Sequence, residues 1–94
     1  MHYELIQRRD KFGVDLHLED SVAAELAPTL MPFAGRKIGP LDTVVEWDQT
    51  WNKNRGRLKA RLPLSTEAGD VAAAMSALIS LTTEAVRSGL QRLQ

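Results

Sequence analysis

Four residues near the N-terminus have side chains that could bind a metal ion. Two pairs, His2-x-Glu4 and His17-x-Glu19, each place an imidazole two residues before a carboxylate. In a β-strand both members of such a pair point to the same face. We expect the two segments to form a hairpin that brings Glu4 opposite His17 and His2 opposite Glu19. Two imidazoles and two carboxylates suit zinc or iron, and the same grouping could adjust a histidine for proton transfer.

A simpler interpretation of these four residues needs no ligand. Neighbouring antiparallel strands often carry opposite charges on their solvent face, and each such pair stabilises a sheet by about a few tenths of a kcal/mol. The expected pairing also assumes a register with Leu5 opposite Leu16, and His2 lies at a terminus that tends to fray. We therefore favour a structural role over a metal or catalytic one.

A second group of residues has the composition of a nucleic-acid-binding surface. It combines one aromatic ring with five basic side chains within residues 51–61: Trp51, Lys53, Arg55, Arg57, Lys59 and Arg61. Single-stranded nucleic acids are bound by such combinations, because basic groups neutralise phosphates and the ring stacks on a base. In the expected strand pairing, however, Glu46 lies opposite Lys59 and Asp48 opposite Arg57, which makes the basic strand one side of a neutral ladder.

The composition of the whole chain narrows the function classes. Twelve basic residues balance twelve acidic ones, so no net charge attracts a polyanion at long range. The chain has no cysteine, which excludes disulfides and thiolate chemistry and favours the cytoplasm. Neither a secretory signal nor an apolar run of the ~20 residues that span a bilayer is present. Phosphate-binding glycine loops, HExxH and GxSxG are also absent, so we expect binding rather than catalysis, and no cofactor.

Alternating polar and apolar residues predict four β-strands, over residues 2–7, 14–19, 43–48 and 57–62. A polar connector that ends in Gly13 joins the first two strands as a hairpin. A longer polar connector over residues 49–56 joins the last two. We expect Trp47 to pack in the core, whereas Trp51, in the second connector, either folds back onto the domain or meets a partner.

Helical periodicity predicts two helices, one after each pair of strands. The first covers about residues 21–34, where apolar side chains share one face: Val22, Leu26, Leu30 and Phe33. Pro28 either kinks this helix or begins a second short one, and Gly35 is placed to end it. The second helix runs from Asp70 to Leu93 and is about 36 Å long at 1.5 Å per residue, with Ser65, Thr66 or Asp70 as its N-cap.

This order of elements predicts a single α+β domain over residues 1–94. The ββαββα order is satisfied by a four-stranded antiparallel sheet with both helices packed on one face, because every amphipathic pattern then buries its apolar side. We expect two similar strand–strand–helix halves without a residue-level repeat.

The long C-terminal helix is the basis of the predicted function. It is longer than a domain with a radius of gyration of roughly 13 Å comfortably covers. We expect its last turns, with Val86, Leu90 and Leu93, to expose apolar surface that a second copy of the chain buries in a two-fold homodimer. The sequence thus predicts a small binding or assembly module without catalytic activity, whose partner is met by Trp51 in the 49–56 connector or by the outer sheet face.

Three alternatives stay open. The first is a nucleic-acid-binding domain that uses the basic residues of the 51–61 segment. The second is an enzyme or metal protein built on His2, Glu4, His17 and Glu19. The third is a small-ligand pocket between sheet and helices, opened by a kink at Pro28.

Overall fold

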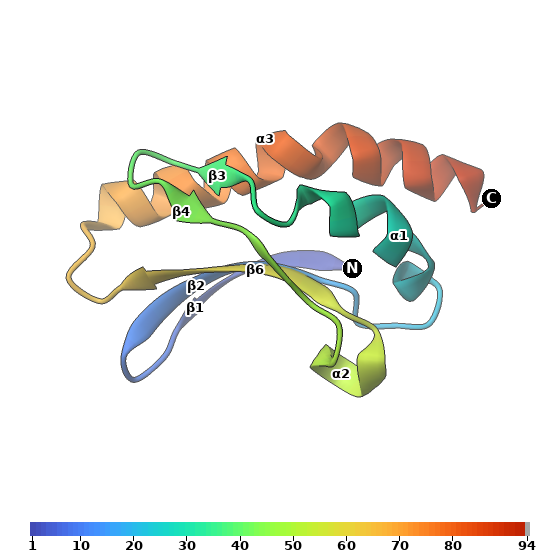
Figure 1. The fold of residues 1–94 in the computed structure, drawn as a ribbon, viewed down its shortest axis with the longest axis horizontal. Helices are drawn as coiled ribbons and strands as arrows, with labels where there is room; N and C mark the ends of the chain where they lie inside the picture. The colour runs from blue at the N-terminus through green and yellow to red at the C-terminus, as the bar shows by residue number, and fades with distance from the viewer. Residues whose placement is uncertain (94) are drawn as a thin grey trace.

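A four-stranded antiparallel sheet covered on one face by helices forms the fold (Figure 1). The computed structural model of this chain describes residues 1–93. The strands are β1 (His2–Gln7), β2 (Lys11–His17), β5 (Glu46–Asp48) and β6 (Arg57–Pro63), in the spatial order β1-β2-β6-β5. The predicted α+β class and the antiparallel four-stranded sheet are therefore confirmed.

The first hairpin has a shorter connector and a different register than we predicted. Its turn is closed by a hydrogen bond of 2.8 Å that the Arg8 N–H donates to the Lys11 carbonyl, so β2 begins at residue 11 and not at residue 14. As a result Leu5 lies opposite Val14, His2 opposite His17, and Glu4 opposite Asp15. The predicted pairing of Leu5 with Leu16, Glu4 with His17 and His2 with Glu19 is wrong by two residues. A two-residue shift preserves the alternation of faces, so each side chain still points to the predicted side.

The predicted strand over residues 43–48 is divided between two sheets. Its first part, β4 (Thr43–Val44), pairs with β3 (Lys37–Ile38), a short strand that lies outside the four predicted strands. Its second part, β5, pairs with β6 in the predicted register, with Glu46 opposite Lys59 and Asp48 opposite Arg57. The chain changes partners at Val45, which is fully buried and exchanges backbone hydrogen bonds with Gly35 and Arg36 (2.8 and 2.9 Å).

The predicted first helix consists of three short pieces. They are η1 (Ala23–Leu26), α1 (Ala27–Leu30) and η2 (Met31–Phe33), the first and last being 3₁₀ turns. Pro28 lies in the first turn of α1, where a backbone N–H makes no intrahelical hydrogen bond, so the proline costs none. Of the two predicted outcomes, the structure has the second short helix. Leu26 and Leu30 are buried, but Val22 is 59% exposed and does not share their face as expected.

The C-terminal helix α3 (Ala68–Arg92) runs the length of the molecule (Figure 1). It begins two residues earlier than predicted, after Glu67 in extended conformation, and none of the three expected residues serves as its N-cap. Its buried face includes Val71, Ala74 and Leu78, which pack on the apolar side of β2 and β6. Thr82 on the same face forms a hydrogen bond with Tyr3, whose hydroxyl oxygen lies 2.6 Å from Thr82 Oγ1. This bond connects α3 to β1. No helix among residues 1–93 is both long and apolar enough to cross a membrane.

Candidate functional site

The sheet face opposite the helices carries charged side chains, and we call it the charged face. Its members come from all four strands: His2, Glu4, Asp15, His17, Glu46, Asp48, Arg57, Lys59 and Arg61. Asp15 lies at its centre and is fully buried. Because a buried carboxylate without partners would cost several kcal/mol, the surrounding groups must satisfy it.

Three donors surround the Asp15 carboxylate. Arg61 Nη1 lies 2.6 Å from Oδ1, whereas Arg57 Nη1 and His17 Nε2 lie 3.1 and 2.9 Å from Oδ2. The register explains this geometry, since Arg57 and Arg61 flank Lys59, the residue directly opposite Asp15 on β6. Both carboxylate oxygens therefore accept charge-assisted hydrogen bonds, which are the strongest kind.

Gly13 makes room for one of these donors. It lies directly opposite Arg61, and a Cβ at this position would be only 2.7 Å from the Arg61 Nη1. The absence of a side chain lets the guanidinium lie across β2 and reach Asp15. The glycine that we expected to close a turn thus serves a packing role within the strand.

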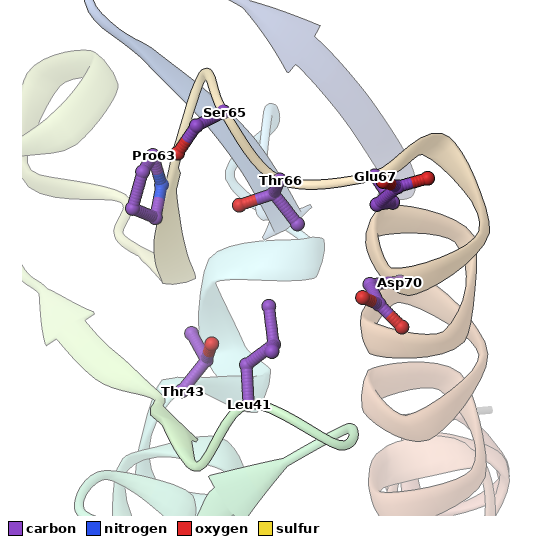
Figure 2. Close-up of a pocket in the computed structure, with 7 residues that line it drawn as sticks. All are labelled: Leu41, Thr43, Pro63, Ser65, Thr66, Glu67 and Asp70. Atoms are coloured by element: carbon purple, nitrogen blue, oxygen red, sulfur yellow. The ribbon is translucent and has the colours of Figure 1, made fainter.

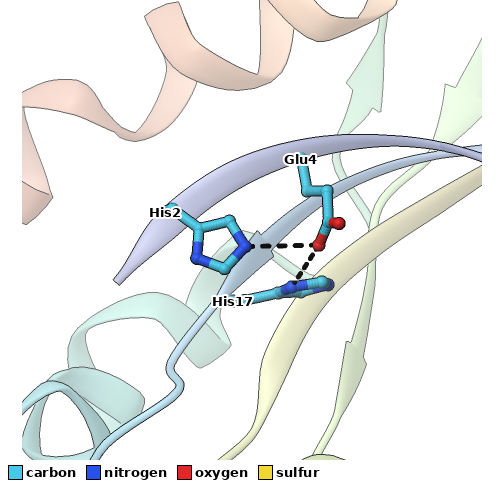
Figure 3. Close-up of side chains that lie close together, drawn as sticks. All are labelled: His2, Glu4 and His17. Atoms are coloured by element: carbon cyan, nitrogen blue, oxygen red, sulfur yellow. Dashed lines mark hydrogen bonds and ion pairs between the residues drawn. The ribbon is translucent and has the colours of Figure 1, made fainter.

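A chain of alternating carboxylates and imidazoles continues from Asp15 to the N-terminus. Figure 3 shows its central part, formed by His17, Glu4 and His2. His17 Nδ1 lies 2.9 Å from Glu4 Oε2, and the same oxygen lies 3.2 Å from His2 Nε2. On its other side the His2 ring places Nδ1 3.1 Å from Glu19 Oε1. The four residues predicted as a metal or acid–base site are therefore brought together, although their strands pair in the corrected register.

Hydrogen bonds within this chain shift the protonation equilibria of two members. The pKa of His2 is raised above its usual value by hydrogen bonds to Glu19 and Glu4, which outweigh partial burial. Burial would raise the pKa of Glu19, but hydrogen bonds from the N-terminal ammonium and from His2 prevail and lower this pKa to about 2. Near neutral pH Glu19 is therefore an anion at the N-terminal end of the sheet.

Trp51 covers one side of His17. The two rings are stacked, with centroids 4.2 Å apart and planes at 28°, and the Arg57 guanidinium carbon lies 5.7 Å from the indole centroid. A tight turn, α2 (Trp51–Asn54), directs the indole inward, and its last three residues have positive φ. Arg55 Nη1 and Asn52 Nδ2 hold this turn by donating to the Glu19 carbonyl oxygen at 2.6 and 3.2 Å. Of the two outcomes expected for Trp51, the structure has the one in which it folds back.

The basic residues of the 51–61 segment mostly contact carboxylates of the same face. Besides its bond to Asp15, Arg57 contacts Asp48 through Nε at 3.0 Å, and Lys59 Nζ lies 3.8 Å from the same carboxylate. Burial would raise the pKa of Asp48, but hydrogen bonds from Arg57 and Thr50 lower it below its usual value. Lys53, by contrast, is exposed. Nucleic-acid binding stays a prediction, with most of its proposed basic groups already paired.

The last turns of α3 lie beside α1 and project beyond the sheet (Figure 1). Arg92 Nη2 donates to the Thr29 hydroxyl at 3.1 Å, so α1 covers one flank of these turns. Val86 is partly buried against the core, whereas Leu90 and Leu93 keep 40% and 37% of their surface exposed. Ile79, two turns before Val86, is 38% exposed.

These exposed residues belong to one regular row along α3, which we call the α3 seam. Its members follow spacings of four and three residues: Ala72, Ser76, Ile79, Thr83, Val86, Leu90 and Leu93. This alternation keeps side chains on one line along a helix and is the spacing of coiled-coil contacts. The seam is distinct from the buried face of α3, which includes Val71, Ala74, Leu78 and Thr82. Of the seam's members, only Val86, Leu90 and Leu93 were named from the sequence as contact residues.

A shallow pocket of about 420 Å³ lies at the beginning of α3 (Figure 2). Leu41 and Thr43 line one side. The other side is formed by the connector between β6 and α3 and by the first turn of the helix, with Pro63, Ser65, Thr66, Glu67 and Asp70. It does not include Pro28, where we expected a ligand pocket. Glu67 and Asp70 already place carboxylates at this helix N-terminus, so the pocket offers no anion site.

Sequence reasoning did not identify Asp15 as the centre of the charged face. The alternation placed it correctly opposite the core, but a residue on that side was expected to be exposed. Its burial follows from the pairing of β2 with β6, which connects strands separated by more than 40 residues and leaves no local signal. No protein-family model, curated protein or solved structure matches this chain, so its function has to be argued from its own geometry.

Proposed function

We propose that this protein is a non-catalytic assembly module of the cytoplasm that forms a two-fold homodimer through α3. The observation that supports this proposal is the α3 seam, a row at coiled-coil spacing whose three largest residues are 37–40% exposed. Exposed apolar surface of this regularity is a feature of interfaces between chains.

The seam has the properties of a self-complementary contact. Val86 lies midway between Ile79 and Leu93, seven residues from each. In an antiparallel pair of α3 helices with Val86 at the two-fold axis, Ile79 of one copy would lie opposite Leu93 of the other. Ile79, Val86 and Leu93 of each copy then meet apolar counterparts, and the same surface is used on both copies, which is what an isologous interface requires.

The neighbouring sheet edge enlarges the proposed interface. β1 is at the end of the strand order, and Leu5 on its helix-facing side is 56% exposed. The bond between Tyr3 and Thr82 places β1 next to α3 one residue from the seam. A stable dimer buries about 800 Å² on each partner, which is more than a single row of side chains supplies, so we include the β1 edge in the contact.

The test is the solution mass by light scattering of the full chain and of a Leu90→Gln/Leu93→Gln variant. The native protein should have twice the monomer mass of 10.4 kDa, and the variant should dissociate at concentrations where the native dimer persists. Removing four leucines from the dimer contact should weaken association on the order of a hundredfold. Glutamine is a good helix former, so the fold should remain.

Val44→Thr is the matched control. Val44 is 44% exposed on β4 and belongs neither to the seam nor to the β1 edge, so its replacement by a polar residue of similar shape should leave the dimer intact. A native protein that stays monomeric at high concentration would refute the proposal. Equal masses for the native protein and the seam variant would refute the role of α3.

A further inference from the structure

The side chains of His2, Glu4 and His17 place three metal-ligand atoms within 4.8 Å of one another. Glu4 Oε2 lies between the rings, 2.9 Å from His17 Nδ1 and 3.2 Å from His2 Nε2 (Figure 3). In a tetrahedral zinc site with bonds of about 2.0–2.1 Å, ligand atoms are roughly 3.3 Å apart. Two of the three separations are thus already close to those of a metal site.

Each histidine has a second carboxylate on the ring nitrogen that faces away from Glu4. His17 Nε2 lies 2.9 Å from Asp15 Oδ2, and His2 Nδ1 lies 3.1 Å from Glu19 Oε1. Metal-binding histidines nearly always donate their remote N–H to a carboxylate, a backbone carbonyl or water, which fixes the ring and directs the other nitrogen's lone pair at the ion. Each ring is thus already held between two carboxylates, so an ion that replaces the proton on the nitrogen facing Glu4 would find both rings oriented for it.

Burial and access also fit a bound ion. The His17 side chain is 5% exposed and held between Asp15 and Trp51, which makes it a rigid ligand. His2 and Glu4 are 48% and 45% exposed, so an ion can enter from solvent, and His2 can rotate to complete the geometry. Glu19 Oε2 is buried and lacks a hydrogen-bond partner within the described chain, leaving acceptor capacity beside the cluster.

We propose that His2 Nε2, Glu4 Oε2 and His17 Nδ1 bind one divalent transition-metal ion of the zinc class, with Asp15 and Glu19 as the outer carboxylates. Two imidazoles and one carboxylate are nitrogen and oxygen ligands that zinc and its neighbours accept, whereas calcium and magnesium prefer oxygen alone. Three protein ligands leave a fourth tetrahedral position for water.

Calorimetric titration of the tag-free protein with Zn²⁺ alone tests the proposal. We expect one ion for each chain. His2→Asn and Glu4→Gln should each weaken binding by at least about tenfold, because loss of an outer partner alone costs 10–100-fold. Both residues are half-exposed, so the variants should keep the native circular dichroism. Glu46→Gln, the same substitution at an exposed carboxylate on the opposite edge strand, should bind Zn²⁺ as the native protein does.

Absorption spectra of the Co²⁺-loaded protein provide a second readout, since tetrahedral nitrogen and oxygen coordination gives an intense visible band that hexahydrated Co²⁺ lacks. Absence of Zn²⁺ binding would overturn the proposal. Binding that the His2 and Glu4 variants leave unchanged would overturn it as well, because the ion would then lie elsewhere. The Leu90→Gln/Leu93→Gln variant should still bind Zn²⁺, so failure of the dimer proposal and failure of the metal proposal are distinguishable.

Discussion

At the scale of single residues, Asp15 organises the charged face. Its carboxylate joins β2 to two arginines of β6, and through His17 it reaches β1. A hydrophobic residue in its place would leave these donors without their shared acceptor. Residues on both edges of the sheet thus depend on one buried group.

Asp15→Ala should destabilise the protein by about 3–5 kcal/mol, the usual cost of removing one member of a buried ion pair. Chemical denaturation measures this difference as a shift of the unfolding midpoint. Glu46→Ala on the same face is the control, and because Glu46 is exposed its loss should change stability by only about 0.5 kcal/mol. Similar small changes for both variants would show that Asp15 does not hold the strands together.

At the scale of elements, hydrophobic periodicity predicted most of the architecture. It located β1, β6 and α3 within two residues at each end, because each buries one long face that alternation or helical spacing marks clearly. The register of β5 with β6 was predicted correctly, but that of the first hairpin was wrong by two residues because its turn closes between Arg8 and Lys11. Strand order could not be predicted, since it depends on contacts between distant segments. The division of the 43–48 strand at Val45 likewise reflects backbone bonds to Gly35 and Arg36 that no local pattern reveals.

The site was predicted in its composition but not in its connections. The pairs of histidines and glutamates were recognisable because a spacing of two keeps them on one strand face. Glu19 was named with them and contacts His2. Asp15 was missed, because its burial and its place beside His17 depend on arginines of the distant strand β6. Trp51 could be assigned to a turn, but its contact with His17 depends on three successive left-handed residues.

The turn between β5 and β6 gives a testable case of element geometry. Gly56 has φ of +97°, and a Cβ there would lie 2.4 Å from the Trp47 ring. Gly56→Ala should therefore lower the stability of the fold in two ways. The positive φ strains an alanine by about 1–2 kcal/mol, and the added Cβ must displace the rigid indole of Trp47. Thermal unfolding should show a lower midpoint than that of the native protein.

Gly35→Ala separates the two contributions. Gly35 has a similar φ of +90°, but no atom lies within 4 Å of the place that a Cβ would occupy, so alanine there meets only the backbone strain. The Gly56 variant should be the less stable of the two. The reverse order would mean that the Trp47 ring moves without cost.

At the scale of the whole molecule, basic and acidic residues are equal in number, and those of the charged face also neutralise one another in pairs. The protein measures 41 × 25 × 19 Å, and the arginines of the charged face are paired within it rather than gathered on one side. Long-range attraction to a polyanion needs an unbalanced patch. The arginines of the charged face therefore pair chiefly with carboxylates of their own sheet.

Heparin chromatography checks this conclusion. The native protein should flow through the column at low salt, because most basic groups of the 51–61 segment already contact carboxylates. Retention that falls steeply with salt, and that is lost in a Lys53→Gln/Arg55→Gln variant, would instead support the nucleic-acid alternative.

The stack of Trp51 on His17 gives the protein an intrinsic optical probe. A protonated or metal-bound imidazole in van der Waals contact with an indole quenches its emission by accepting an electron from the excited ring. Trp47, on the core side of the sheet, has no such neighbour within the described residues and supplies a constant reference signal. Events at the His17 ring can therefore be followed by fluorescence in the native protein, without any attached dye.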